Sequence, residues 1–329
     1  MKLQDFPLGQ TLKLEARGSW PEAYHYFEPD HMKAVVAAWH AGRPLLIRGK
    51  PGVGKSQLAR AVAECRKMQF ISVVVQPRTE YQDLLWQYDA VARLADAQIL
   101  AAMQDPAIQK KLALKHYVAP GPLWWALNPK TARKRNQRQD GAGKSPDPRL
   151  MPEEYAKNGN VVLIDEIDKA DIDLPNGLLE LLGNQSFTTP HGEIVASGSA
   201  DKPLIIVTTN EDRELPPAFV RRCLVLRIAL PKNDDETAFT AAMRKYAHAH
   251  FKDRLDESLF IEAAELLRKE RIAAEAAHQP PPGPAEYLDL LRVVDRLAGG
   301  DKQAQRDLLE EMRPFVLGKA GSALDESDL

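Results

Sequence analysis

The chain has 329 residues, a charged fraction of 27% and a formal net charge of −2 at pH 7, which gives no overall case for binding nucleic acid or a membrane surface. Its length allows about two domains, and its only cysteines, Cys65 and Cys223, are too few for a disulfide framework or a cysteine-rich zinc site. Because it also lacks a signal-peptide pattern and any apolar run long enough to span a bilayer, we expect a soluble, cytoplasmic protein.

The first predicted elements are a helix and a strand. Apolar residues recur at helical spacing from His31 to His40, and Gly42 ends the pattern. The short apolar run Leu45-Leu46-Ile47 follows and is typical of a buried parallel strand.

A glycine-rich octet comes directly after this strand. Gly49-Lys50-Pro51-Gly52-Val53-Gly54-Lys55-Ser56 fits the pattern G-x-x-x-x-G-K-S/T, and an amphipathic helix pattern follows it. In this order the backbone N–H groups of the bend and the N-terminus of the helix converge on phosphate oxygens. Lys55 would then hold the β- and γ-phosphates, and Ser56 would give its hydroxyl to Mg²⁺. The predicted nucleotide-binding residues are Gly49, Pro51, Gly52, Val53, Gly54, Lys55, Ser56 and Gln57.

Four aromatic residues precede the first helix, at Trp20, Tyr24, Tyr26 and Phe27. Aromatic side chains in such a place are most often core anchors, and we interpret them so. Packing beside the adenine of a bound nucleotide is the alternative.

The middle of the chain carries two strands and an insertion. Phe70 to Val75 predicts a buried strand, and Tyr88 to Met103 predicts one long helix. From about 128 to 160 the sequence turns polar and predicts an inserted loop. Its basic residues suggest contact with nucleic acid, with a solvated loop or an acidic neighbouring subunit as alternatives. They are Lys130, Arg133, Lys134, Arg135, Arg138 and Lys144.

Two carboxylates follow the next apolar run. Val161 to Ile164 predicts a buried strand that ends in Asp165 and Glu166. In open α/β sheets, ligands bind at the carboxyl ends of the strands. Asp165 can therefore hold Mg²⁺ together with Ser56, and Glu166 can orient and polarise an attacking water beside the γ-phosphate.

A third buried strand, Leu204 to Thr209, ends in Asn210. An amide at this edge can hydrogen-bond the attacking water or the γ-phosphate, and a plain turn-former is the alternative. Residues 186–195 predict a hairpin, and Leu224 to Ile228 predicts another short strand.

The last hundred residues change to helical patterns. Apolar residues recur at helical spacing over 235–250, 256–277, 285–297 and 301–312, with polar, proline-rich or glycine turns between them. The whole pattern predicts a P-loop α/β fold: a parallel sheet in a three-layer α/β/α arrangement, followed by a small all-α lid domain. We expect the first domain over residues 1–231 and the second over 232–329.

Taken together, these motifs resemble those of the AAA+ ATPases. The segments GKPGVGKS, VVLIDE, IIVTTN and PPAFVRRC occur in the family's order, with a helical domain after them. Within the superfamily the chain most resembles the MoxR group, which is related to the dynein-type modules. That closer likeness depends on QPRTEYQDLLWQYDAVARL, GPLWWAL and IDEIDKADIDLPNGLLELLGNQSFTTP.

The resemblance implies a role for each motif. It implies that Asn210 is the sensor-1 residue and that Arg222 is an arginine finger for the nucleotide site of a neighbouring subunit, with Arg221 as the fallback. A finger supplied by a neighbour implies a ring, by resemblance a hexamer. It assigns Walker A to Gly49, Gly52, Gly54, Lys55 and Ser56, and Walker B to Asp165 and Glu166.

Two features depart from the family pattern. Ala285 stands where relatives carry the sensor-2 arginine of the lid, and Arg292 is a possible substitute. The insertion before Walker B is the other departure, and we expect partner specificity there and in the helical stretch before it.

The sequence thus predicts an enzyme, an ATPase that uses ATP and Mg²⁺ in an oligomeric ring to remodel, activate or mature a partner protein. Relatives often work with partners that carry von Willebrand factor A domains, so the resemblance implies such a partner. Two alternatives stay open at this point. One is a nucleic-acid-associated motor of restriction or defence type, and the other is a slow nucleotide-dependent switch or scaffold.

Overall fold

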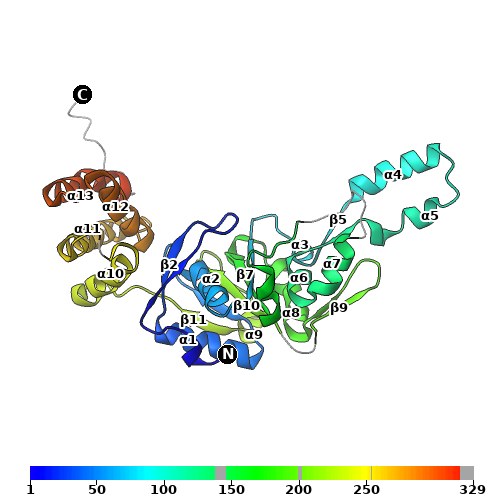
Figure 1. Ribbon diagram of the computed structural model, residues 1–329, viewed down its shortest axis with the longest axis horizontal. Coiled ribbons are helices and arrows are strands. Elements are labelled where there is room, and N and C mark those ends of the chain that lie inside the picture. The colour runs from blue at the N-terminus through cyan, green and yellow to red at the C-terminus, as the bar shows by residue number, and fades with distance from the viewer. Residues whose placement is uncertain (138–145, 199–201, 253, 319–329) are drawn as a thin grey trace.

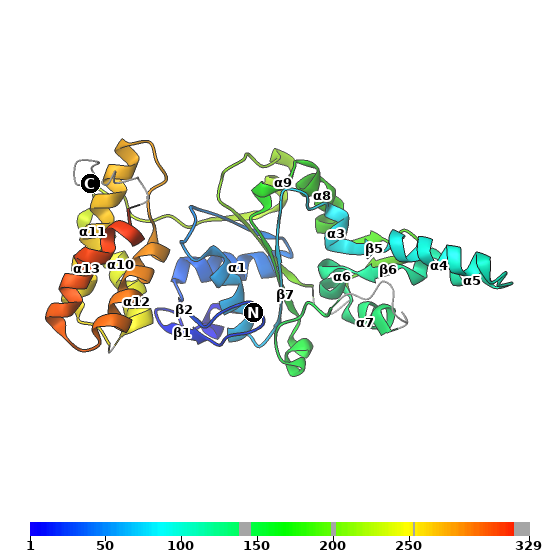
Figure 2. The same cartoon turned by 90° about the horizontal axis from the view of Figure 1, so that it is seen from above.

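The computed structural model describes residues 1–137, 146–198, 202–252 and 254–318. A central sheet with helices on both faces forms the body of the molecule (Figure 1). A helical domain lies at one end and a narrow arm projects from the other, and both are also seen from above (Figure 2).

The central sheet has five strands that are all parallel to their neighbours. Its order is β11-β3-β10-β7-β4, so the strand that leads into the glycine-rich octet lies beside the centre. The strands are β3 (Leu45–Arg48), β4 (Gln69–Val74), β7 (Asn160–Asp165), β10 (Leu204–Thr209) and β11 (Leu224–Arg227).

These strands are apolar on both sides because both faces of the sheet are covered. Along β7, Val161 and Leu163 pack into one core, while Val162 and Ile164 pack into the other. One face is covered by α1 (Pro29–Ala41) and α2 (Lys55–Cys65). The other is covered by α3 (Tyr81–Leu85), α6 (Pro122–Leu127), α8 (Asp173–Asn184) and α9 (Pro217–Arg222). The predicted three-layer α/β/α arrangement is confirmed.

The elements around this body are short. The chain begins with η1 (Leu3–Asp5) and the antiparallel pair β1 (Thr11–Leu14) and β2 (Ala23–Tyr26). Turn η4 (Ile167–Lys169) follows β7, and the predicted hairpin is formed by β8 (Ser186–Thr188) and β9 (Ile194–Ala196).

The arm, residues 86–120, contains the long helix predicted from Tyr88 to Met103, which begins two residues later than predicted. Strand β5 (Trp86–Tyr88) pairs with β6 (Val118–Pro120), and helix α4 (Ala90–Ala102) starts only after Asp89. The Asp89 carboxylate accepts a hydrogen bond from the N–H of Ala92 at 2.8 Å and so caps the helix. Helix α5 (Ile108–Lys111) and turn η2 (Leu114–His116) return the chain to the body.

The predicted inserted loop over about 128–160 is wrong for its first part, which forms helix α7 (Pro129–Gln137). The side chain of Asn128 accepts a hydrogen bond from the N–H of Thr131 at 3.2 Å, and Pro129 follows it, so the helix has ordinary start signals. Turn η3 (Glu153–Asn158) occupies its last part. Arg138 and Lys144 lie outside the described residues.

The C-terminal part is a separate bundle with its own core, as expected of an all-α lid. It consists of α10 (Glu236–Phe251), α11 (Glu257–Ala276), α12 (Pro284–Ala298) and α13 (Lys302–Val316). Across the described ranges, none of the helices is long and apolar enough to cross a membrane.

Candidate nucleotide site

The glycine-rich loop joins β3 to α2 and needs glycine for two different reasons. Gly52 and Gly54 have φ values of +79° and +88°, a region that side-chain-bearing residues rarely adopt. A Cβ on Gly49 would stand 2.2 Å from the carbonyl oxygen of Ile228, so the close approach of β11 requires glycine there. The loop therefore presents its backbone without obstruction, as a phosphate cradle must.

Lys55 lies at the start of α2 and is 5% exposed. Its Nζ donates to the carbonyl oxygens of Gly49 and Lys50, at 2.7 and 2.9 Å, and to Oδ1 of Asn210 at 2.7 Å. Burial lowers the pKa of this ammonium, and the nearby carboxylate of Asp165 opposes that effect. The lysine is thus held between the loop and the end of β10.

Ser56 and Asp165 face each other across the sheet edge. The Ser56 hydroxyl is 2.8 and 2.9 Å from the two carboxylate oxygens of Asp165, and the hydroxyl of Thr208 donates to Oδ1 of Asp165 at 2.5 Å. Oxygen atoms of this kind are the ligands that Mg²⁺ prefers, usually with several waters. The donor set of Ser56 and Asp165 therefore fits the predicted Mg²⁺.

Glu166 has φ +58°, an uncommon value for a residue with a side chain. Its N–H donates to the hydroxyl of Thr208 at 2.9 Å, and its Oε1 accepts from Nδ2 of Asn210 at 3.1 Å. Its Oε2 is paired with the ammonium of Lys169. The left-handed turn aims this carboxylate at the end of β10, beside Asn210 and near Lys55.

Two polar residues that sequence reasoning missed support this edge. Thr208 joins Asp165 to Glu166, as described above. Asp168 is 2% exposed and accepts from the N–H groups of Asn210 and Asp212, at 3.1 and 2.9 Å. The sequence signals for them are the first threonine in IIVTTN and the third acidic residue in the stretch that begins with Asp165.

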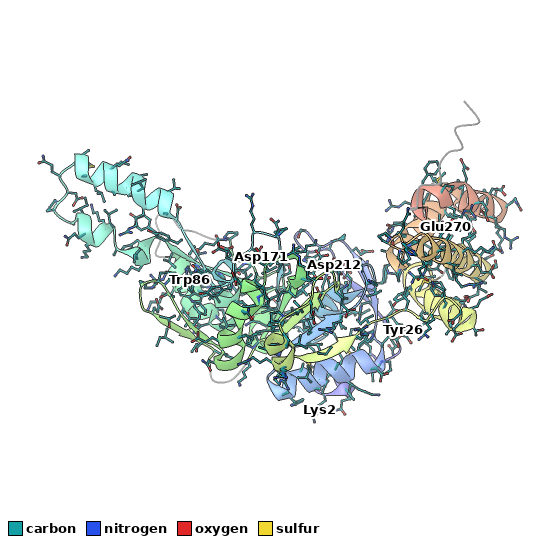
Figure 3. The ribbon with its side chains drawn as sticks, turned by 180° about the vertical axis from the view of Figure 1, so that it is seen from behind. Lys2, Tyr26, Trp86, Asp171, Asp212 and Glu270 are labelled. Atoms are coloured by element: carbon teal, nitrogen blue, oxygen red, sulfur yellow. The ribbon has the colours of Figure 1, made fainter. Side chains whose placement is uncertain are left out.

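A cavity of about 460 Å³ adjoins these side chains, between the body and the lid. Tyr24, Tyr26 and Tyr246 line it, so two of the four aromatic residues that we interpreted as core anchors face the cavity instead. Phe27 is fully buried, and Trp20 packs on Phe70 with ring centroids 5.4 Å apart, as core residues do. Figure 3 labels Tyr26 on the side of the body that faces the helical domain. A larger hollow, about 1380 Å³, lies between β2 and the lid, but neither Lys55 nor Glu166 lines it.

The lid touches the loop at the residue that replaces the expected arginine. A Cβ on Gly52 would lie 3.2 Å from the Cβ of Ala285, so this part of α12 packs directly on the glycine-rich loop. Arg292 lines the same cavity and is paired with Asp289.

Arg221 and Arg222 are not brought to this cavity. Both are exposed at the end of α9, and neither is among the residues that line the cavity. Arg43 holds the turn by donating to the carbonyl oxygens of Arg222 and Cys223, at 3.0 and 3.1 Å. Neither guanidinium group therefore belongs to the cavity that Lys55 lines in the same chain.

Comparisons with known proteins agree with this site. The family model described as AAA domain (dynein-related subfamily) matches residues 44–223, from the start of β3 to the end of α9. No curated protein matches the chain. A crystal structure described as a candidate ATPase from Cytophaga hutchinsonii ATCC 33406 covers 88% of this chain and 80% of its own, with 16% identity and a TM-score of 0.37.

Proposed function

Because this chain belongs to the dynein-related subfamily of AAA domains, it binds nucleotide and is an ATPase, and we propose that it works as a MoxR-like ring that remodels, activates or matures a partner protein. In this proposal residues 1–231 form the nucleotide-binding domain and residues 232–329 form the lid. The separate core of the C-terminal helices supports that division.

The observation that carries the proposal is the hydrogen-bonded edge of three adjacent strands. Lys55 starts the helix that follows β3, Glu166 and Asn210 come directly after β7 and β10, and Asn210 bonds to both of the others. We assign Lys55 to the β- and γ-phosphates of ATP, Glu166 to the attacking water, and Asn210 to positioning both. Ser56 and Asp165 would hold Mg²⁺, which when bound neutralises charge on the phosphate oxygens. Gly49, Pro51, Gly52, Val53, Gly54 and Gln57 complete the phosphate cradle.

The ring follows from the position proposed for the arginine finger. Arg222, or Arg221 in its place, is exposed and does not line the cavity of its own chain, which supports a role in a neighbouring site. A guanidinium there can neutralise charge that develops on the transferred phosphoryl group, an effect worth about 10³–10⁵ in rate. Because AAA domains generally assemble into rings, we propose a hexamer.

The client is the least defined part of the proposal. A partner with a von Willebrand factor A domain is our inference from the MoxR likeness. The alternative, a nucleic-acid motor, is weakened because Arg133 pairs with Glu153 and Arg135 pairs with Glu193, so half of the four described basic residues of the expected cluster are already engaged.

Mixed rings test the proposal. Glu166→Gln and Arg222→Ala subunits should each be inactive alone, because every site lacks either its carboxylate or its finger. Mixed in equal amounts, they should recover about a quarter of wild-type turnover, since random assembly pairs an intact Glu166 with an intact neighbouring Arg222 at about that fraction of interfaces.

The control is Arg227→Ala, which removes another exposed arginine a few residues further along, in β11. This variant should hydrolyse ATP like the wild type when it is assayed alone, so it needs no second subunit type to restore turnover. If mixing restores no activity although pull-down of tagged Glu166→Gln subunits recovers untagged Arg222→Ala subunits, the finger does not act between subunits and the ring mechanism is wrong.

A further inference from the structure

The arm, residues 86–120, contains a helix that is not covered by the rest of the chain. Helix α4 has no buried residue, and the arm extends away from the central sheet in both views (Figures 1 and 2). Trp86, labelled in Figure 3, marks its base. Nothing in the proposed ATPase chemistry uses this element.

Helix α4 turns its charged residues inward. Arg93 donates to the carbonyl oxygen of Leu112 at 3.0 Å and to the hydroxyl of Tyr88 at 3.1 Å. Asp96 accepts from the hydroxyl of Tyr117 at 2.8 Å. Burial and the Asp96 carboxylate raise the pKa of Tyr117 to about 12, so this hydroxyl keeps its proton and remains a donor at neutral pH.

The outer face of α4 is apolar instead. Val91 is 80% exposed, Leu94 63%, Ile99 57% and Met103, the C-cap, 70%. A surface helix normally buries such a stripe and exposes its charges, which is the reverse of what α4 does. Several large apolar side chains exposed along one helix mark a docking surface.

The unpaired charge of the arm and of the adjoining helix α7 is positive. The acidic residues of the arm are all engaged inside it: Asp89 caps α4, Asp96 binds Tyr117, and Asp105 pairs with Lys111. Lys110 and Lys115 have no acidic partner among the described residues. In the adjoining α7, Lys130 and Lys134 are likewise exposed and have no such partner within the described ranges.

We propose that the outer face of α4 docks an amphipathic segment of the partner protein, one that carries acidic residues beside its apolar ones. The apolar stripe supplies the buried contact, and the unpaired lysines of the arm and α7 select the acidic charge. This inference rests on the proposed function only in taking the occupant to be the protein on which the ATPase acts.

A membrane surface fits the same face less well. A helix that lies on anionic lipid carries its own lysines and arginines on the polar side, where they reach the headgroups. In α4 the single basic residue, Arg93, is bound within the arm. The free cations come from other elements, which suits a protein partner that reaches across them.

The test uses two fluorescent helical peptides that share one apolar stripe, one with glutamates and the other with lysines on the polar face. Wild-type protein should bind the acidic peptide about tenfold more tightly than the basic one, as measured by anisotropy. Leu94→Gln/Ile99→Gln should weaken binding of the acidic peptide about tenfold. Lys110→Gln/Lys115→Gln should reduce the ratio of the affinity for the acidic peptide to the affinity for the basic one. Leu297→Gln in α12 is the matched control, because Leu297 is 64% exposed and lies in the lid, and it should bind like the wild type.

Several results would overturn the inference. They are equal affinity for the two peptides, unchanged binding by the Leu94/Ile99 variant, binding of that face to anionic vesicles in place of peptide, and dissociation of the oligomer in that variant alone. The last two would assign the face to a membrane or to a second copy of the chain. ATP hydrolysis measured on the same samples keeps the tests separate: peptide binding without hydrolysis would contradict the proposed function and leave this inference standing.

Discussion

The carboxyl edge of the sheet and the arm differ in the kind of side chain that they bury and the kind that they expose. At the edge, Lys55, Asp168 and Asn210 are nearly inaccessible to solvent and are hydrogen-bonded to neighbouring residues. In the arm, Arg93 and Asp96 of α4 are also bonded to neighbouring residues, but the large apolar side chains of the same helix are exposed. A buried polar network costs free energy unless it is fully bonded, so it fixes geometry for chemistry. An exposed apolar face gains its free energy only when a partner covers it.

The largest effect is expected where the edge carries the chemistry. Glu166→Gln keeps the size of the side chain but removes the carboxylate that we assign to the attacking water. Turnover should fall about 10²–10⁴-fold while the affinity for ATP stays close to that of the wild type. Single-turnover kinetics and equilibrium binding check this, and undiminished hydrolysis would remove Glu166 from its assigned role.

The next effect concerns the close packing of the loop. Gly49→Ala places a Cβ 2.2 Å from the carbonyl oxygen of Ile228, so the loop or β11 must shift. We expect a loss of about 3 kcal/mol in the free energy of unfolding, measured by urea denaturation. Gly183→Ala is the control: nothing lies within 4 Å of its added Cβ, and in helix α8 it should gain about 0.5–1 kcal/mol.

The free energy of unfolding should also depend on pH through His25, a buried histidine of the cavity wall, and not through an exposed histidine. Burial lowers the pKa of His25 to about 3, with a further contribution from His31, against an ordinary value of 6.5. Because the unfolded chain binds the proton more readily, the stability that neutral His25 maintains is lost as pH falls below 6.5. The loss should reach about 2 kcal/mol at pH 5.

Urea unfolding at pH 7.5 and pH 5 measures this loss, and His25→Gln should make it smaller by that amount. Burial also lowers the pKa of His250, to about 4, so part of the pH dependence should remain in the variant. His278→Gln, at an exposed turn, is the control and should leave the loss unchanged. An identical loss in wild type and His25→Gln would exclude His25 as its source.

The smallest effect separates the two regions most directly. Leu94→Ala on the arm should change the free energy of unfolding by no more than about 0.5 kcal/mol, because the side chain is already in water. Leu163→Ala in β7 removes the same atoms from a fully buried position and should cost about 2–5 kcal/mol. Similar losses in the two variants would mean that the arm face is covered in the free protein.

Much of the site was predictable because its signals are local. The fixed spacing of Gly52 and Gly54 predicts the bend of the loop. Asp165, Glu166 and Asn210 follow continuous apolar runs, which predict buried strands. Parallel strands bring their carboxyl ends to one edge, so these side chains could be expected together before the strand order was known. The family model confirms the dynein-related AAA family, and the sheet with its covering helices confirms the α/β/α layers.

Other features could not be read from neighbouring residues. Tyr24 and Tyr26, in β2, line the cavity beside the lid, while Phe27, the next residue after the strand, is fully buried. Thr208 and Asp168 became visible as supports only when β10 was placed beside β7. The first part of the loop predicted over about 128–160 is helix α7, which starts at the Asn128 cap although its sequence is polar and basic.

The sequence by itself determined that this protein has a phosphate-binding loop, two carboxylates and an amide at strand ends, and a helical second domain. Those properties depend on residue types at short spacing, where backbone geometry leaves little choice. Only the tertiary structure decided that Arg222 does not line the cavity of its own chain, that Ala285 packs on the loop, and that α4 exposes apolar side chains to solvent. Each of these depends on which element packs against which, a choice made by burial over the whole chain.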